Sequence, residues 1–151
     1  MISIALYKPD IPQNTAAILR LCACFNMKVH IIEPCGFNLE DIRFKRVVMD
    51  YADNIKIIRY QDFRDFEKKN SKYRIVLMTT KAKKIYNKFK YKKNDILLFG
   101  RESAGVPKEI HGMVNLKLKI PVNTKTRSLN ITVAAAIVSS EALRQNNFLK
   151  I

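Results

Sequence analysis

Short apolar, β-branched runs alternate with amphipathic segments along almost the whole chain, and this alternation constrains the fold more than any other feature. The strand-like runs are residues 2–7, 28–33, 55–60, 73–80, 95–99 and 116–122. Apolar residues recur at helical spacing in residues 14–26, 38–51, 61–70, 106–113 and 129–145. This order predicts an α/β fold with a mainly parallel sheet and helices on both of its faces.

Two predicted helices carry stripes of apolar side chains. In the segment 38–51 the apolar positions are Leu39, Ile42, Val47 and Met49. In the closing segment they are Ile131, Ala135, Val138 and Ala142. Such stripes are typical of helices that pack one face against a sheet.

The chain is predicted to be a single domain spanning residues 1–151. It has 151 residues, of which 48% are hydrophobic, enough to bury a core, and no linker or repeat divides it. No apolar run approaches the roughly 18 residues of a membrane span. The start, "MISIALYKPDIPQN", lacks a basic segment followed by a long apolar stretch, as a signal peptide would have. We therefore expect a soluble, cytoplasmic protein with no membrane partner.

Positive charge is the strongest feature of the composition. Lys and Arg total 28 against 13 acidic residues, which gives a net charge of +15. A surface of this sign attracts polyanions such as RNA. The candidate RNA-binding residues are Lys81, Lys83, Lys84 and Lys88, which are interleaved with Tyr86, Phe89 and Tyr91. Lysines for phosphates beside aromatic rings for bases suit a nucleic-acid surface, but a solvated basic loop or a general lysine bias fits equally well.

Metal sites and the common nucleotide cradles are disfavoured. The cysteines and histidines are Cys22, Cys24, Cys35, His30 and His111. They lack metal-ligand spacing, so structural roles are expected for them and no metal is predicted. The chain contains neither GxGxxG nor GxxxxGK[ST], and its four glycines are too few for a glycine-rich phosphate cradle.

Three polar clusters follow predicted strands, where ligands bind in open α/β sheets. They are "PQNTAAILR" (12–20), "FGRESAGVP" (99–107) and "IPVNTKTRSLN" (120–130). Each is weak alone, because an arginine on a helix is usually a surface residue and a glycine-flanked turn is usually only a turn.

Together and in this order, the clusters resemble the three motifs of the SpoU branch of the SPOUT RNA methyltransferases. The first is Asn14 followed six residues later by Arg20. The second reads Phe99, Gly100, Glu102, Gly105 and Pro107, and the third reads Ile120, Pro121, Ser128, Leu129, Asn130, Ala134 and Ile137. The resemblance runs nearly end to end and also includes "ALYKPDIPQNT" and "MDYAD". It is greatest to the small single-domain members that 2'-O-methylate the wobble nucleotide of certain tRNAs.

The resemblance implies a C-terminal deep trefoil knot, which composition and periodicity do not predict. It also implies S-adenosyl-L-methionine as the cofactor, a homodimer whose RNA site is completed across the interface, and a tRNA anticodon stem-loop as the substrate. Met78, Gly100, Ile120 and Ser128 match cofactor-contacting positions, with Thr79 and Leu129 nearby. Gly100 is expected to approach the cofactor closely.

Catalytic roles are implied for Arg20, Asn14 and Glu102. A sulfonium methyl group is already electrophilic, so the enzyme must align the ribose 2'-oxygen and help remove its proton. Arg20 matches the family's reaction centre, but a guanidinium is always protonated, which favours binding a phosphate or polarising the 2'-hydroxyl. Either a phosphate or a transiently perturbed arginine would then take the proton, and the sequence leaves this choice open. Asn14 is expected to order the loop around Arg20. Glu102 is expected to hold the second motif or Arg20 by charge-assisted hydrogen bonds, with a purely turn-stabilising role as the alternative.

Two other functions stay open from the sequence. One is 2'-O-methylation of a different tRNA or rRNA nucleotide, and the other is RNA binding by a knotted protein without catalytic activity. Arg101 stands where some family members have proline, and such departures leave the choice of RNA undecided.

Overall fold

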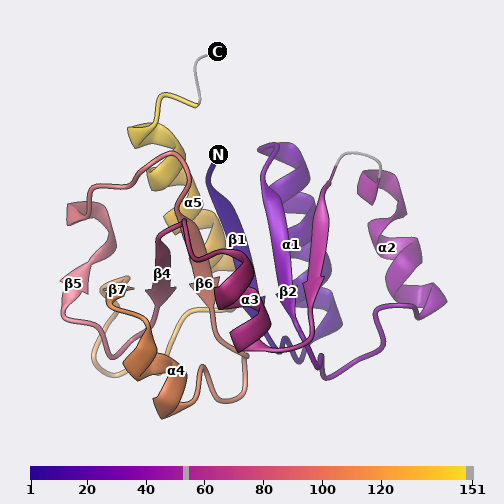
Figure 1. Cartoon of the computed structure of the whole chain (residues 1–151), viewed down its shortest axis with the longest axis horizontal. Helices are drawn as coiled ribbons and strands as arrows, with labels where there is room; N and C mark the ends of the chain where they lie inside the picture. The colour runs from indigo at the N-terminus through magenta and orange to yellow at the C-terminus, as the bar shows by residue number, and fades with distance from the viewer. Residues whose placement is uncertain (53–54, 149–151) are drawn as a thin grey trace.

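The computed structural model describes residues 1–52 and 55–148, which form a seven-stranded sheet flanked by helices (Figure 1). The strands are β1 (Ser3–Tyr7), β2 (Lys28–Ile32), β3 (Ile57–Tyr60), β4 (Ile75–Met78), β5 (Lys84–Ile85), β6 (Ile96–Phe99) and β7 (Leu116–Lys119). The helices are α1 (Pro12–Cys24), α2 (Ile42–Ala52), α3 (Phe63–Lys69), α4 (Lys108–Met113) and α5 (Ile131–Gln145), with a 3-10 turn, η1, at Tyr86–Lys88.

The sheet has the order β3-β2-β1-β6-β4-β7-β5, and its strand pairs are parallel. The predicted α/β fold with a parallel sheet is confirmed. The predicted strands and helices are each present, with ends that differ by a few residues. The deep trefoil knot stays a prediction. Among the described residues, no helix combines the length and the apolar character needed to cross a bilayer.

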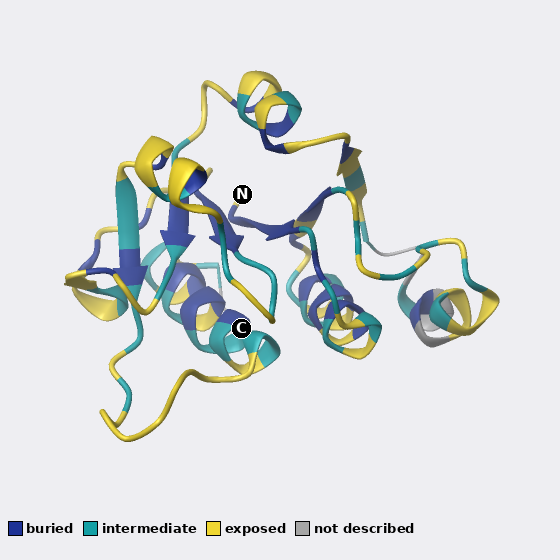
Figure 2. Cartoon of the chain, turned by 90° about the horizontal axis from the view of Figure 1, so that it is seen from below, coloured by how far each residue is buried: buried dark blue, intermediate teal, exposed yellow. Residues whose placement is uncertain are grey.

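Two hydrophobic clusters cover the two faces of the sheet, because side chains along a strand point alternately to opposite faces. In β1, Ile4 and Leu6 pack in the cluster beneath α1 and α5, whereas Ala5 and Tyr7 pack in the cluster beneath α3 and α4. The buried strands accordingly run between two layers of helices (Figure 2). All five residues of β1 are buried, as expected for a strand in the middle of a parallel sheet.

The stripe on α5 is confirmed, since Ala135, Val138 and Ala142 are fully buried. The amphipathic reading of α2 is only partly right. Ile42 begins that helix and is 74% exposed, so it does not belong to the packed face. The side chains of Val47 and Met49, and residue 53 of the "MDYAD" match, lie outside the described residues.

The lysine-rich segment 81–93 is more structured than the sequence indicates. It contains β5 and η1, and Ala82, Phe89 and Tyr91 are buried. Phe89 and Tyr91 pack edge to face, with ring centroids 5.0 Å apart. The idea that these two rings stack on bases is therefore wrong, because they anchor the segment to the core instead.

The sheet order brings the second and third polar clusters together. β6, β4 and β7 are neighbours, so their carboxyl ends lie side by side. The chain leaves these ends at Phe99, Met78 and Lys119. Helix α1 starts just after β1, the other neighbour of β6, and brings the first cluster to the same edge.

Candidate active site

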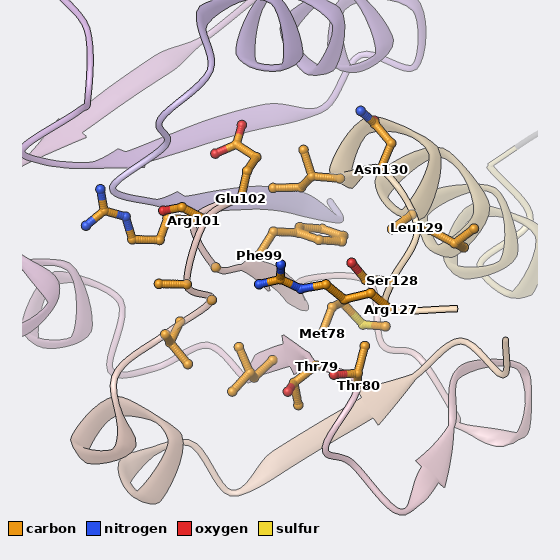
Figure 3. A pocket seen from close by; sticks show the side chains of 18 of the residues that line it. Met78, Thr79, Thr80, Phe99, Arg101, Glu102, Arg127, Ser128, Leu129 and Asn130 are labelled. Atoms are coloured by element: carbon orange, nitrogen blue, oxygen red, sulfur yellow. The ribbon is translucent and has the colours of Figure 1, made fainter. Parts of the chain in front are cut away.

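A cavity of about 610 Å³ lies at this edge of the sheet. Its walls come mainly from residues 77–81, 99–106 and 127–131, the segments that follow β4 and β6 and precede α5 (Figure 3). Its volume falls within the range of about 300–1,000 Å³ that is usual for small-molecule sites. The position agrees with the expectation that ligands bind beyond the carboxyl ends of parallel strands.

All six residues expected to contact a cofactor line this cavity. They are Met78, Thr79, Gly100, Ile120, Ser128 and Leu129. Figure 3 shows Met78, Thr79, Ser128 and Leu129 among the side chains that line the cavity. The structure thus brings these residues together from distant parts of the sequence, and their contact with a cofactor stays a prediction.

Gly100 is required by the turn that follows it. A Cβ atom on Gly100 would lie 2.5 Å from the carbonyl carbon of Gly105 and 2.8 Å from the nitrogen of Val106. The turn folds back because Arg101 and Gly105 exchange two backbone hydrogen bonds of 3.1 and 2.8 Å. Gly105 itself has a φ of 68°, which favours glycine. The close neighbour of Gly100 in this structure is the turn of its own motif.

Side-chain hydrogen bonds join the three motifs at one rim of the cavity. Asn14 Nδ2 donates to Glu102 Oε1 at 3.3 Å, and Asn130 Nδ2 donates to Asn14 Oδ1 at 3.1 Å. Asn130 also caps α5, since its Oδ1 accepts from the backbone nitrogen of Thr132 at 2.8 Å. The second carboxylate oxygen of Glu102 accepts from the backbone nitrogen of Asp10 at 2.9 Å. This arrangement favours the turn-holding role for Glu102.

A second link ties the loop before α1 to the second motif. Asp10 Oδ1 accepts from Arg101 Nε at 2.9 Å and from its terminal nitrogen at 2.7 Å. Ser103 donates to the other oxygen of Asp10 from both its backbone and its hydroxyl. Burial opposes ionisation of Asp10, but these hydrogen bonds outweigh it and hold the pKa of the carboxyl below its usual value. Arg101 is therefore a structural partner of Asp10.

Arg20 lies apart from the cavity within one chain. It is exposed on α1, and its guanidinium carbon lies 5.1 Å from the ring centroid of Tyr51 in α2. Asn14 and Arg20 are six residues apart on one helix, which places them roughly 120° apart around its axis. The structure therefore brings Asn14 and Glu102 together but does not bring Arg20 to them.

The sequence model of the SpoU rRNA methylase family matches residues 1–140. The chain belongs to this family. The tRNA (cytidine(34)-2'-O)-methyltransferase of Beijerinckia indica is 47% identical over 144 residues, which cover 94% of this chain and 90% of that protein. The protein of the same name from Escherichia coli K12 is 37% identical over 147 residues, covering 96% and 94%. A solved structure from work on the 2-OH methylation of C/U34 on tRNA superposes with a TM-score of 0.92 at 32% identity and covers 97% of each chain.

In this SpoU-family chain the four candidate RNA-binding lysines are exposed, and one of them reaches the cavity. They are Lys81, Lys83, Lys84 and Lys88, of which Lys81 lines the cavity. The Lys84 ammonium lies 5.0 Å from the centroid of the Phe89 ring, so it covers a core aromatic residue. Contact of these lysines with RNA stays a prediction.

His30 has the structural role expected from the sequence, whereas His111 is one of the residues that line the cavity. His30 is buried, and its Nδ1 lies 2.8 Å from the Tyr60 hydroxyl. Burial, with a smaller effect of Lys28, lowers the pKa of His30 to about 4. Within residues 1–52 and 55–148, no three His, Cys, Asp or Glu side chains gather as a metal site requires.

Several residues of the site were not assigned from the sequence. Asp10 gave no signal, because its partner Arg101 is 91 residues away. Asn130 belongs to the third motif, but the sequence does not indicate what its side chain contacts. Thr80 and Arg127 both line the cavity, and the only sequence signal for them is their position beside Thr79 and Ser128.

Proposed function

We propose that this protein transfers a methyl group from S-adenosyl-L-methionine to the ribose 2'-oxygen of nucleotide 34 of tRNA, a cytidine or a modified uridine, in the cytoplasm. The observation that carries the proposal is the cavity at which the three family motifs meet, joined through Glu102, Asn14 and Asn130. The relatives named for cytidine-34 methylation match nearly the full length of this chain, which supports the same substrate position here.

The residues of the cavity fit the proposed cofactor. Leu77, Ile120 and Leu129 provide apolar wall for an adenine ring, and Thr79, Thr80 and Ser128 provide hydroxyl groups for polar atoms. The cofactor supplies a methyl group activated by its bond to a sulfonium sulfur. The protein must then hold the ribose 2'-oxygen in line with that methyl group and exclude competing water.

Arg20 is the proposed contact to the reacting nucleotide. Its guanidinium is protonated at rest, so it binds the adjacent phosphate or polarises the 2'-hydroxyl, and the hydroxyl proton passes to a phosphate oxygen or to a transiently deprotonated Arg20. Because Arg20 lies outside the cavity of its own chain, it meets the reaction centre in a second copy. The site proposed here is therefore shared between two chains.

Exposed apolar side chains on α1 and at the start of α5 suit contact with a second copy of the chain. Ala17 is exposed one turn before Arg20 on the same face of α1. Ile11, Leu129 and Val133 are 41%, 38% and 47% exposed, and they lie at the starts of α1 and α5 beside the cavity. An apolar face that borders an incomplete site is the arrangement expected of a homodimer interface.

The anticodon stem-loop is proposed to bind across the exposed lysines. Lys81 lines the cavity, and the exposed Lys83, Lys84 and Lys88 follow it in the same segment. Their ammonium groups can contact phosphates, which position an RNA without reading its sequence. The choice of nucleotide 34 then depends on the shape of the loop that enters the cavity.

The experiment that tests this function is methylation of total tRNA from cells that lack the enzyme. The purified protein is incubated with labelled cofactor, and the methylated nucleoside is mapped by mass spectrometry. Label in a 2'-O-methylpyrimidine at position 34 supports the proposal. Label at another tRNA or rRNA nucleotide contradicts the substrate assignment, and absence of label despite cofactor and RNA binding contradicts the enzymatic activity.

A further inference from the structure

Four charged side chains line the cavity, and two of them are held by neighbouring groups. Arg101 pairs with Asp10, and Glu102 accepts hydrogen bonds from Asn14 and from the backbone of Asp10. The other two are Lys81 and Arg127, and neither forms an ion pair with any residue that the structure describes. The cavity therefore has cationic groups available for an anionic part of a ligand.

Arg127 is placed over the cavity by ordered segments on both sides of it. Before it, a turn is closed by hydrogen bonds from Thr126 and Lys125 to Asn123. After it, Asn130 caps α5 and is bonded to Asn14. Figure 3 shows the Arg127 side chain extending across the cavity, beside Ser128 and in front of Phe99 and Met78.

We propose that Arg127 binds the carboxylate of the methionine part of S-adenosyl-L-methionine, an inference that rests on the proposed function. That carboxylate is the only anionic group of the cofactor. A guanidinium matches a carboxylate with two parallel N–H···O bonds, which fixes direction as well as charge. The contact positions the methionine part of the cofactor, and with it the sulfur that carries the methyl group.

Arg127 fits this role better than Lys81. Both residues are exposed, but Lys81 is a point charge at the start of the lysine-rich segment, which continues through Lys83 and Lys84. Arg127 instead adjoins Ser128 and Leu129, two of the residues that line the cavity beside the end of β4. Its planar fork is also more selective for a carboxylate than an ammonium group is.

The test compares two ligands that differ in the methionine part. S-adenosylhomocysteine carries the carboxylate, whereas 5'-methylthioadenosine retains the adenosine and lacks the whole amino-acid end. Dissociation constants are measured by calorimetry for wild type, Arg127→Gln and Arg127→Lys. The control is Lys125→Gln, which removes a positive charge from the same loop at a residue outside the cavity lining. Thermal unfolding of each variant checks that the fold is kept.

We expect Arg127→Gln to weaken S-adenosylhomocysteine binding about ten- to a hundredfold, as for the loss of a charge-assisted hydrogen-bonded pair. Arg127→Gln should change binding of 5'-methylthioadenosine by less than about twofold. The affinity of Arg127→Lys for S-adenosylhomocysteine should lie between those of wild type and Arg127→Gln, and that of Lys125→Gln should equal wild type.

Equal weakening of both ligands would overturn the inference, because Arg127 would then only shape the cavity. Unchanged S-adenosylhomocysteine binding would also overturn it, including the case in which only anticodon stem-loop binding falls. A wild-type protein that binds neither ligand would instead refute the proposed cofactor, so failure of the function is distinguished from failure of the inference.

Discussion

Asn14 donates a hydrogen bond to Glu102 across 88 residues of chain, and its own side-chain oxygen accepts one from Asn130, which is 116 residues away. One amide thus connects the first turn of α1, the turn after β6 and the start of α5. The backbone carbonyl of Asn14 accepts a further bond from the Thr132 hydroxyl at 3.4 Å. The geometry of the cavity rim therefore depends on the hydrogen bonds that Asn14 forms with these three residues.

Replacing Glu102 with Gln should weaken this connection without changing side-chain volume. The variant loses the charge and one of the two carboxylate oxygens that accept from Asp10 and Asn14. We expect a loss of about 1–3 kcal/mol in the free energy of unfolding and a large loss of methyl transfer. Urea denaturation measures the free energy of unfolding. Glu109→Gln is the control, because its ion pair with Arg64 is exposed and should contribute less than about 1 kcal/mol. Equal effects of the two changes would contradict the structural role of Glu102.

Gly100→Ala should damage the cavity directly. Its methyl group would meet Gly105 at 2.5 Å, so the turn from Arg101 to Gly105 must shift. We expect roughly 1–3 kcal/mol of destabilisation together with weaker cofactor binding. The matched change is Gly112→Ala in α4, where nothing lies within 4 Å of the new methyl group and helix propensity gives a gain of about 0.5–1 kcal/mol. Calorimetric melting of both variants tests the pair, and a stable Gly100→Ala protein with normal cofactor affinity would be inconsistent with this packing.

Arg20→Ala should abolish methyl transfer and change cofactor affinity little, since Arg20 is exposed on α1 and does not line the cavity. Single-turnover rates and cofactor titration separate the two effects. Arg64→Ala on α3 is the control, because it also removes an exposed arginine but lies on the other face of the sheet. Full activity in Arg20→Ala would refute the proposed role of this residue.

A mixture of two inactive variants tests whether the site is shared between chains. Arg20→Ala and Glu102→Gln subunits are co-expressed, and mixed dimers are compared with each parent. If Arg20 acts in the partner's cavity, each mixed dimer holds one intact site, and random pairing restores about a quarter of wild-type activity. If Arg20 acts within its own chain, no activity returns.

His30 should make the fold less stable in mild acid. Burial, followed by Lys28, lowers its pKa to about 4, so the unfolded chain binds a proton at His30 before the folded chain does. The stabilisation is complete above the unfolded pKa of about 6.5 and is lost as the pH falls from there toward 4, at up to about 1.4 kcal/mol per pH unit. The measurement is the free energy of unfolding against pH for wild type and His30→Phe. A slope that is the same in both between these pH values would contradict the prediction.

The sequence predicts the layered α/β fold because each strand and helix leaves its own periodic pattern. It does not predict β5 and η1, because a lysine-rich segment with isolated core residues such as Phe89 has no such period. It also identifies the three motifs but not their mutual contacts. The bonds from Asn14 to Glu102 and from Arg101 to Asp10 depend on β6 lying beside β1, and that neighbour relation is a property of the whole sheet.

Arg20 is identified by the sequence, but its function is not explained by the fold of one chain. Its place in the first motif is evident from the sequence, yet the folded chain leaves it against Tyr51 on the surface of α1. The spacing from Asn14 already places the two residues on different sides of the helix. The contact proposed for Arg20 is with a second copy of the chain, so a single chain cannot contain it.

Methyl transfer to the 2'-oxygen of nucleotide 34 is tested most directly with two anticodon stem-loops that differ by one oxygen atom. One carries ribose at position 34, and the other carries 2'-deoxyribose there, so only the first has the proposed acceptor oxygen. We expect methyl transfer to the first RNA and none to the second, with similar binding of both. Equal transfer to the two RNAs would contradict methylation of the nucleotide-34 2'-oxygen.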